Sequence, residues 1–362
     1  MKVLVAGASG VVGHAAARHF MERGCDVVGL ARRPPGDLGK ARLVALDLCD
    51  QDACEAAVSS LRDTTHVVYA ASHELPDLVS GWGDEVQMQT NLAMLRNLLQ
   101  PLLRDAPSLR QVTLLQGMKA YGVHLGAITI PARERAPRHQ HANFYWLQED
   151  WLRARQRGQE WRMTILRPQV VFGQALGGSM NLMAAIGVYA AVLRERGEPL
   201  HMPRGTRWIF EAVDADLLAR ACYWCATTEA CAGKTFNLHN GEAFEWASSW
   251  PAIAQALDMQ AGPARPVSFA REALGWQPTW ERVVDRYNLV APRQLADFVG
   301  LSFQYADRCF GTASEGVRAP SLASTLKARA AGFQDFCDTD EMFRRWFSRY
   351  QALRWLPPLH SH

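Results

Sequence analysis

The chain begins with Val3-Leu4-Val5-Ala6-Gly7-Ala8-Ser9-Gly10-Val11-Val12-Gly13, an apolar run followed by three spaced glycines. A helical pattern comes next, so the stretch predicts a strand, a tight turn and a helix. Glycines allow the turn and a close approach of the backbone, and free N–H groups at the helix start attract phosphate. We therefore predict that Gly7 and residues 9–13 cradle the pyrophosphate of a dinucleotide. A turn that binds no ligand is the alternative.

A second predicted strand, residues 26–31, runs into the pair Arg32 and Arg33. In nucleotide-binding folds an acidic residue at this place bonds the ribose 2′-hydroxyl, whereas a guanidinium suits a 2′-phosphate. The pair therefore favours NADP(H) over NAD(H), and a solvated basic turn is the alternative. After the third predicted strand, Asp47 either meets the adenine or caps the next helix. Leu48 beside it is assigned to the same cofactor wall.

Composition and charge exclude several classes of protein. The 362 residues are 48% hydrophobic, with a formal net charge of +3 and both signs interspersed. This predicts a large core in about two lobes and no site for nucleic acid or an anionic membrane. The longest apolar stretch, residues 180–193, is too short to span a bilayer. A strand begins almost at the first residue, so we expect no signal peptide and a cytoplasmic location.

The cysteines and histidines predict no metal or disulfide chemistry. The eight cysteines lack the density of a secreted disulfide-stabilised domain, so we expect reduced thiols. Cys222 and Cys225 have the spacing of a redox motif, but they fall inside a predicted helix, residues 217–226, and are interpreted as packed thiols. His139 and His141 lie in a polar predicted loop, where a solvated role is expected. No metal site is predicted.

Short apolar runs alternate with amphipathic stretches over the first 170 residues or so. The alternation indicates a parallel sheet wrapped by helices. The predicted strands are residues 3–6, 27–30, 43–46, 67–71, 112–115 and 163–166. Between them, residues 88–103 have apolar side chains at helical spacing and should pack one face on the sheet.

After Pro168 the pattern becomes mainly helical, with one strand-like piece at residues 235–238. The predicted helices there are residues 179–196, 248–257, 292–309, 321–331 and 340–353. We therefore predict an α/β fold, a Rossmann-type doubly wound parallel sheet with a smaller, mainly helical substrate lobe. The Rossmann domain is assigned to residues 1–172 and 208–240, and the substrate lobe to residues 173–207 and 241–362.

Several segments together identify a family. They are residues 7–13, 31–34, 65–69, 91–97 (NLAMLRN), 115–121 (LQGMKAY), 143–150 (NFYWLQED) and 167–173 (RPQVVFG). The chain resembles the progesterone 5β-reductase and iridoid synthase-like group of atypical short-chain dehydrogenases. The likeness continues through residues 179–181, 214–217, 236–246 and 332–357, so it covers nearly the full length.

The resemblance implies an activity and partners. Members of the group use NADPH to reduce an activated carbon–carbon double bond, with hydride sent to the β-carbon of an enone or enal. The implied substrate is a small or medium-sized apolar enone, and a homodimer is expected from the family. Negative charge develops on the carbonyl oxygen as the enolate forms, so the site needs a donor there. The alternatives are an extended dehydrogenase acting on a ketone or nucleotide sugar, and a non-catalytic NADP(H)-sensing protein.

The catalytic residues are carried over from the family with one departure. Lys119 matches the active-site lysine, whose implied role is to lower the phenol's proton affinity and hold the nicotinamide ribose. The family motif NFYYxxED places the catalytic phenol at its second tyrosine, and here Trp146 stands at that position. Indole donates one hydrogen bond but is no acid near neutral pH. Three phenols are candidates to replace it: Tyr145, which we favour, Tyr305 as second choice, and Tyr121.

The resemblance also implies the walls of the site. The remaining cofactor contacts are predicted to be Tyr69, Ala70, Ala71, Asn91, Gly117, Arg167, Pro168, Val170 and Val171. Substrate contacts are predicted at Trp146, Met180, Phe303 and Tyr305, with Met183 and Phe333 as further pocket candidates. For Asn91 a helix cap, for Arg167 a surface charge, and for the apolar residues ordinary core packing are the alternatives.

Overall fold

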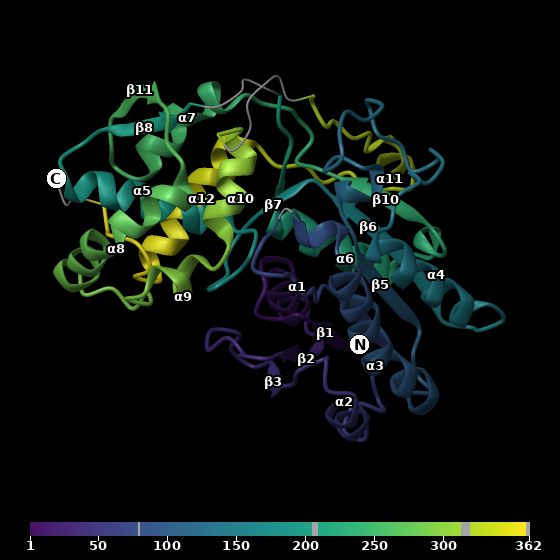
Figure 1. Cartoon of the computed structure of the whole chain (residues 1–362). Helices are drawn as coiled ribbons and strands as arrows, with labels where there is room; N and C mark the ends of the chain where they lie inside the picture. Colours follow the sequence, from purple (N-terminus) through teal and green to yellow (C-terminus); the bar gives the residue numbers. More distant parts are fainter. Residues whose placement is uncertain (79, 205–208, 313–318, 360–362) are drawn as a thin grey trace. The chain divides into compact units, whose positions relative to one another are not determined.

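The structure is a computed structural model that describes residues 1–78, 80–204, 209–312 and 319–359. The chain folds into two compact units, each assembled from separate segments (Figure 1). The first unit consists of Met1–Gln169, Ala215–His239 and Ala323–Asp335. The second consists of Val170–Asp214, Asn240–Leu322 and Phe336–His362.

A seven-stranded parallel sheet forms the centre of the first unit, in the order β10-β6-β5-β4-β1-β2-β3. Its strands are β1 (Lys2–Ala6), β2 (Asp26–Ala31), β3 (Arg42–Ala45), β4 (His66–Tyr69), β5 (Gln111–Leu115), β6 (Arg162–Pro168) and β10 (Thr235–Leu238). Most are short runs of apolar and β-branched residues buried on both faces, as a parallel sheet requires. The predicted Rossmann-type fold and all seven predicted strands are confirmed.

Helices cover both faces of this sheet. They are α1 (Val11–Glu22), α2 (Gln51–Val58), α3 (Glu85–Asp105), α4 (Phe144–Gln156), α6 (Ala215–Thr227) and α11 (Leu326–Ala330). The predicted amphipathic stretch is α3, whose Leu95, Leu98, Leu99 and Leu102 are fully buried against alternate residues of β1, β4 and β5. α1 packs against α6, and α2 and α4 pack against α3. Three 3₁₀ turns complete the unit: Ser80–Gly83, Met118–Tyr121 and Glu229–Cys231.

The second unit is mainly helical around an aromatic core. Its helices are α5 (Leu182–Glu195), α7 (Trp246–Ala256), α8 (Phe269–Arg286), α9 (Leu295–Val299), α10 (Ser302–Phe310) and α12 (Thr339–Ala352). Two pairs of parallel strands join them, β7 (Val170–Phe172) with β9 (Ala212–Asp214) and β8 (Leu200–Pro203) with β11 (Ala261–Arg265). Trp280 and Trp346 are among the largest fully or almost fully buried side chains.

The predicted domain boundaries differ from the structure in three places. Residues 170–172 and 209–214 belong to the second unit, because β7 and β9 pair with each other and not with the central sheet. Residue 208, where the second Rossmann segment was predicted to begin, lies outside the described residues. Residues 323–335 return to the first unit, where Ala323 bridges Ala132 and α11 contacts β10. The substrate lobe is therefore interrupted once more than the sequence pattern indicates.

Two helix predictions in the second half are also wrong in detail, and one helix was not predicted. The single helix predicted over residues 292–309 is two helices, α9 and α10. Gly300 separates them with φ of +53°, and a Cβ there would lie 2.6 Å from the carbonyl oxygens of residues 177 and 178. The helix predicted over residues 321–331 is only α11. The long helix α8 was not predicted, and its pattern is interrupted by Gly275 and Pro278.

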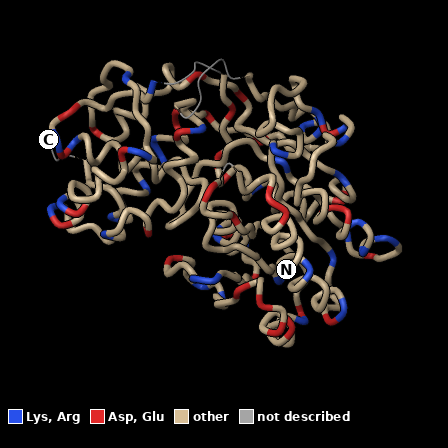
Figure 2. The backbone as a smooth tube through the Cα atoms, in the orientation of Figure 1, with Lys and Arg blue, Asp and Glu red and all other residues tan. Residues whose placement is uncertain are grey.

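Charges and cysteines follow the sequence-based expectations where the structure addresses them. Lys, Arg, Asp and Glu are mixed along both units (Figure 2). All eight cysteines are free thiols, and Cys222 and Cys225 are buried in α6 as predicted. Within the described ranges, no helix combines the length and apolar character needed to cross a bilayer. Nor does that part of the chain gather three or more His, Cys, Asp or Glu side chains as metal ligands.

Candidate active site

The glycine turn between β1 and α1 has a geometry that only glycine allows. Gly7 has φ of +85°, and a Cβ on it would lie 2.9 Å from backbone atoms of Ala70 and Ala71 after β4. A Cβ on Gly13 would overlap the Gly7 carbonyl oxygen. The first glycine therefore permits the turn beside β4, and the last lets α1 pack against the turn.

This turn presents the start of α1 as an anion site. The first N–H groups of α1, like those of any α-helix, have no acceptor within the helix. The N-cap residue is Gly10, which has no side chain that could accept a hydrogen bond from them. Ser9, Val11 and Val12 are half-buried. The glycines at 7 and 13 let the turn pack closely against the segment after β4 and against α1. The residues present thus fit a pyrophosphate, bound by backbone N–H groups and the helix dipole.

The residues predicted to contact the cofactor after β2 and β3 differ in how they are placed. Arg32 and Arg33 are exposed directly after β2, the place from which a guanidinium can reach a 2′-phosphate. Asp47 is exposed and accepts a hydrogen bond from the Cys49 backbone N–H at 2.9 Å. The N-cap of α2 is Asp50, so the prediction that Asp47 caps that helix is wrong. Leu48 is buried, with its side chain in the core.

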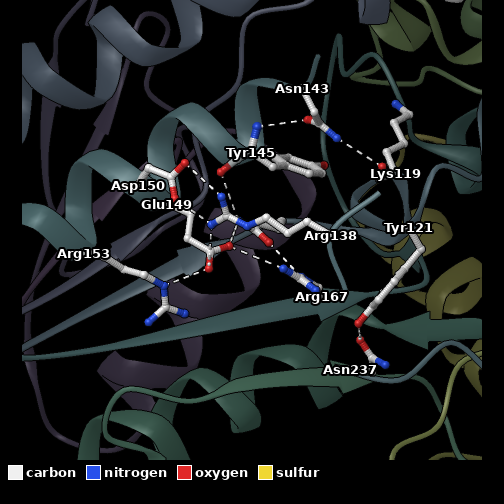
Figure 3. Close-up of polar contacts among 11 residues, drawn as sticks. Lys119, Tyr121, Arg138, Asn143, Tyr145, Glu149, Asp150, Arg153, Arg167 and Asn237 are labelled. Carbon is white, nitrogen blue, oxygen red and sulfur yellow. Dashed lines mark hydrogen bonds and ion pairs between the residues drawn. The ribbon is translucent and has the colours of Figure 1, made fainter. Parts of the chain in front are cut away.

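Asn143 joins the two segments that carry Lys119 and Tyr145 (Figure 3). It is the N-cap of α4, where its Oδ1 accepts a hydrogen bond from the Tyr145 backbone N–H at 3.0 Å. Its Nδ2 donates to the Lys119 carbonyl oxygen at 3.1 Å. Lys119 lies in the 3₁₀ turn that follows β5. One side chain therefore fixes the start of α4 relative to the turn with the predicted lysine.

Tyr145 and Lys119 share a buried aromatic neighbour, Trp82. The rings of Tyr145 and Trp82 meet edge to face with centroids 5.5 Å apart, and Lys119 Nζ lies 2.9 Å from the Trp82 ring centroid. The Tyr145 hydroxyl is turned toward Gly117, where a Cβ would lie 3.3 Å from its oxygen. Glycine at 117 thus leaves open the space in front of the phenol. The structure brings Lys119, Tyr145 and Gly117 together at the carboxyl end of β5.

Burial and charge keep the Tyr145 hydroxyl protonated. Burial raises the pKa of Tyr145 above its ordinary value, the negative charge of Glu74 raises it further, and the positive charge of Arg167 opposes both. A phenol in this state donates a hydrogen bond and does not act as a base. The arrangement therefore suits stabilisation of a negative oxygen more than proton abstraction.

Trp146 lies away from this group. The Trp146 side chain is 9% exposed. The guanidinium carbons of Arg138 and Arg167 lie 4.6 and 5.3 Å from the centroid of its ring. Its Nε1 has no hydrogen-bond partner among the described residues. Successive side chains on an α-helix are rotated by about 100° around its axis. Tyr145 and Trp146 therefore face different surroundings. The predicted contact of Trp146 with the substrate stays a prediction.

The buried carboxylate of Glu149, in the middle of α4, forms ion pairs and hydrogen bonds with several neighbouring side chains (Figure 3). It pairs with Arg153 at 2.8 Å, with Arg138 at 3.2 Å and with Arg167 at 3.4 Å. Gln116 donates to Glu149 at 3.1 Å and to the Tyr145 carbonyl oxygen at 3.2 Å. Burial favours the neutral acid, but hydrogen bonds from Arg153 and Gln116 and the arginine charges outweigh it and lower the pKa of Glu149. This network ties α4 to β5 and β6.

The other two candidate phenols are Tyr121, in the first unit, and Tyr305, in the second. Tyr121 donates its hydroxyl proton to Asn237 Oδ1 of β10 at 2.7 Å, and its ring stacks near Arg167 (Figure 3). This hydroxyl is therefore engaged in a hydrogen bond with the edge strand β10. Tyr305 is half-buried in α10 of the second unit. Of the two candidates in the first unit, Tyr145 shares the Trp82 ring with Lys119.

Several residues predicted to touch the cofactor are instead engaged within the first unit. Asn91 is fully buried and bonds both backbone groups of His73. Tyr69 is 1% exposed, in the core under the sheet. Arg167 is buried and donates to Gln116 and Glu149. Asn91 and Arg167 thus form hydrogen bonds with neighbouring segments of the first unit, and Tyr69 packs in its core.

The remaining predicted wall residues are divided between the units. Pro168 is buried at the end of β6 in the first unit. Val170 and Val171 lie half-buried in β7 and Met180 half-buried before α5, all in the second unit. Met183 is fully buried, Phe303 packs on Trp276, and Phe333 packs on Trp224. The last three are therefore core residues, which was the alternative reading.

Sequence patterns missed four residues of the site: Trp82, Gln116, Asn143 and Glu74. Asn143 had a usable signal, because asparagine directly before a helical pattern is a preferred N-cap. The other three come from loops or strand ends whose contacts are set by tertiary packing. No local periodicity distinguishes them from surface residues.

Comparisons with known proteins agree with the fold and the resemblance. A family model described as the NAD dependent epimerase/dehydratase family matches residues 3–238. The chain is 29% identical to an (S)-8-oxocitronellyl enol synthase of Antirrhinum majus, covering 91% of this chain and 85% of the relative. It is also 29% identical to a 3-oxo-Delta(4,5)-steroid 5-beta-reductase of Arabidopsis thaliana, over 98% of this chain and 92% of the relative. The resemblance to the progesterone 5β-reductase and iridoid synthase-like group is confirmed.

Solved structures agree on the fold. The chain superposes on a UDP-glucose 4-epimerase of Thermus thermophilus in complex with NAD, with a TM-score of 0.66 and 17% identity, over 97% of this chain and 99% of that one. A UDP-glucose 4-epimerase of Bifidobacterium longum in complex with NAD⁺ and UDP gives a TM-score of 0.67 at 15% identity, over 97% and 98% of the two chains. At such identities the likeness concerns the fold alone.

Proposed function

The chain belongs to the NAD dependent epimerase/dehydratase family and is an oxidoreductase of the extended short-chain dehydrogenase superfamily, and we propose that it is an NADPH-dependent reductase of activated carbon–carbon double bonds. Its substrates are small or medium-sized apolar enones or enals. The observation that carries the proposal is the placement of Lys119 Nζ and the Tyr145 ring on one shared side chain, Trp82, with Asn143 joining their two backbone segments. The names of the two relatives, an enol synthase and a steroid reductase, support the same reaction class.

The chemistry of enone reduction fits this pair. When bound, the dinucleotide supplies a hydride, which adds to the β-carbon. The carbonyl oxygen then carries the enolate charge, and the buried Tyr145 hydroxyl donates a hydrogen bond to it. Lys119, which shares the Trp82 ring with Tyr145, adds a positive charge to this part of the site. Because the developing charge is delocalised over an enolate, the reaction needs less acid assistance than the reduction of a ketone, which leaves a localised alkoxide.

A ketone reductase or a nucleotide-sugar epimerase is the alternative. Those enzymes carry Tyr-x-x-x-Lys, whereas Glu149 stands four residues after Tyr145 and Asp150 four residues after Trp146. A carboxylate at that position supplies no positive charge to the phenol. Glu149 instead forms ion pairs with three arginines. An alcohol product or an epimerised sugar would favour this alternative.

The test is a panel of enones and enals with NADPH, followed by product analysis. We expect a saturated carbonyl product and a fall in kcat of about 10²–10³-fold for Tyr145→Phe, the usual effect of removing one donor from a developing oxyanion. Tyr121→Phe serves as the matched control and should keep kcat. Tight NADPH binding with no turnover of any substrate would favour a cofactor sensor instead.

The preference for NADP(H) is a separate part of the proposal. Arg32→Ser and Arg33→Ser together should weaken NADPH binding by about tenfold to a hundredfold, as expected for lost hydrogen bonds between charged groups. NADH binding should stay as it is, and Lys40→Ser provides an exposed cation as control. Protein fluorescence during cofactor titration measures both. Equal losses for the two cofactors would contradict the assignment. The expected homodimer stays a prediction, which sedimentation equilibrium tests.

A further inference from the structure

A buried histidine connects the first helix to the loop between β2 and β3. His14 follows the last glycine of the turn between β1 and α1, and its side chain is buried in α1. Its Nε2 lies 2.9 Å from Oδ1 of Asp37, a residue of that loop. An ionised carboxylate only accepts hydrogen bonds, so the imidazole nitrogen donates. The contact joins segments 23 residues apart along the chain and lies within the first unit.

The loop is anchored again at the next residue. Leu38 is almost fully buried, whereas residues 36, 37, 39 and 40 are exposed. Its carbonyl oxygen accepts a hydrogen bond from the Ala41 backbone N–H at 3.0 Å, just before β3 begins. A buried apolar side chain beside a hydrogen bond to a buried histidine fixes this part of the loop against the first unit.

Two prolines lie between this anchor and the predicted 2′-phosphate site. The loop begins Arg32-Arg33-Pro34-Pro35-Gly36-Asp37. Proline fixes its own φ and restricts the residue before it to extended conformations. The backbone from Arg33 to Pro35 therefore has little freedom, and Gly36 is the least restricted residue between it and the anchor. The position of Asp37 thus limits where the two arginines can lie.

We propose that His14 and Asp37 are positioning residues for NADP(H). Their contact holds the arginine pair after β2 in place relative to the pyrophosphate site at the start of α1. The pyrophosphate and the 2′-phosphate belong to one adenosine group, so the cofactor presents them at a narrow range of spacings. A loop that is already held binds both without a further loss of conformational freedom. NADH has no 2′-phosphate and should gain little from the contact. The inference rests on the proposed preference for NADP(H).

The test compares 2′-phospho-ADP-ribose with ADP-ribose, two ligands that carry the pyrophosphate and differ only in the 2′-phosphate. Isothermal titration calorimetry of the cofactor-free protein gives both dissociation constants, and their ratio measures 2′-phosphate recognition without any turnover. His14→Leu should weaken 2′-phospho-ADP-ribose binding by about tenfold and ADP-ribose binding by less than about twofold. His14→Gln should restore the wild-type ratio, because its amide nitrogen can donate to Asp37.

A second histidine of the same helix is the matched control. The His19 ring packs edge to face on the Tyr223 ring of α6. His19→Leu should therefore keep the wild-type ratio of the two dissociation constants. An unchanged ratio in His14→Leu, or an equal change in His19→Leu, overturns the proposal.

Two variants at Asp37 separate the hydrogen bond from the charge, and they carry the test if His14→Leu does not fold. Asp37→Ala and Asp37→Asn both remove the carboxylate, but only asparagine can still accept from His14. Asp37→Ala should bind 2′-phospho-ADP-ribose about tenfold more weakly than Asp37→Asn. Equal affinities of these two variants would also overturn the proposal.

A second measurement needs no ligand. Hydrogen–deuterium exchange of the cofactor-free protein reports how firmly the loop is held, and the hydrogen-bonded Ala41 amide is one of its probes. His14→Leu should speed exchange in residues 36–41 and leave β1 unchanged. Wild-type exchange rates in the loop of this variant would contradict the proposal.

Failure of this inference can be told apart from failure of the proposed reaction. If the wild type binds the two nucleotides equally well, the NADP(H) preference and this inference fail together. If the ratio responds as expected but no enone is reduced, the proposed reaction fails while the positioning role of His14 and Asp37 is supported.

Discussion

At the scale of single residues, two glycines of the same turn should respond differently to an added methyl group. A Cβ on Gly13 would overlap the Gly7 carbonyl oxygen, which is backbone and cannot move cheaply. A Cβ on Gly10 would lie 3.4 Å from the same oxygen, an ordinary contact, and φ of −83° is open to alanine. Gly13→Ala should therefore lower the free energy of unfolding by about 2 kcal/mol, and Gly10→Ala by less than about 0.5 kcal/mol.

Chemical denaturation of the cofactor-free protein measures this difference without any effect of bound ligand. NADPH titration of the same variants measures the effect on cofactor affinity, since a displaced turn should bind the pyrophosphate more weakly. Equal stability of the two variants would mean that α1 does not pack against the turn as the structure has it.

Residue-scale reasoning predicted the cofactor half of the site better than the catalytic half. The glycine spacing follows from backbone geometry, which local sequence determines. The choice between Tyr145 and Trp146 depends on the rotation of α4, and that rotation is set by contacts with Gln116 and Arg167 from other elements. A family alignment alone places Trp146 at the phenol position. Only the packed helix separates the two side chains.

At the scale of elements, the N-cap of α4 should couple stability to activity. Asn143→Ala removes the cap acceptor and the bond to the Lys119 carbonyl oxygen, and should cost about 1 kcal/mol. Asn143→Asp keeps the cap and adds a favourable charge at the helix start, but it cannot donate to that carbonyl. We expect Asn143→Asp to retain stability and lose about tenfold in kcat through misplacement of Lys119.

The matched control is Asp338, the N-cap of α12 in the second unit, whose side chain accepts from the Glu341 backbone N–H at 2.8 Å. Asp338→Ala should cost a similar amount of stability and leave kcat unchanged. Urea denaturation and steady-state kinetics on the three variants measure both quantities. Full activity in Asn143→Asp would show that the bond to Lys119 has no part in placing the lysine.

Element predictions succeeded where one periodicity dominates. The parallel strands are short apolar runs, and α3 has leucines on one face, so local pattern and burial agree. The pattern failed at α9 and α10, where Gly300 ends one helix against the chain at residues 177 and 178. That contact joins segments more than 100 residues apart along the chain. No window of neighbouring residues contains it.

At the scale of the whole molecule, the same limit explains the domain boundaries. The sequence indicates where apolar patterns change, near residue 170, and this is close to the observed change of unit at Val170. It does not indicate that Ala323 returns to the first unit, because a single β-bridge to Ala132 and the packing of α11 on β10 decide that. Long-range pairing is therefore what sequence periodicity leaves out.

The central sheet should also make stability depend on pH through one histidine. His66 lies in β4, inside the seven-stranded sheet, and burial lowers its pKa to about 4 from the ordinary 6.5. The folded state thus binds this proton less readily than the unfolded state, so the stabilisation is complete above pH 6.5 and is lost as pH falls toward about 4. The loss should reach about 3 kcal/mol. His66→Gln should flatten the urea-unfolding free energy over that pH range, whereas His201→Gln, a half-buried histidine of the second unit, should not. The same acid sensitivity in His66→Gln as in the wild type would place the titrating group elsewhere.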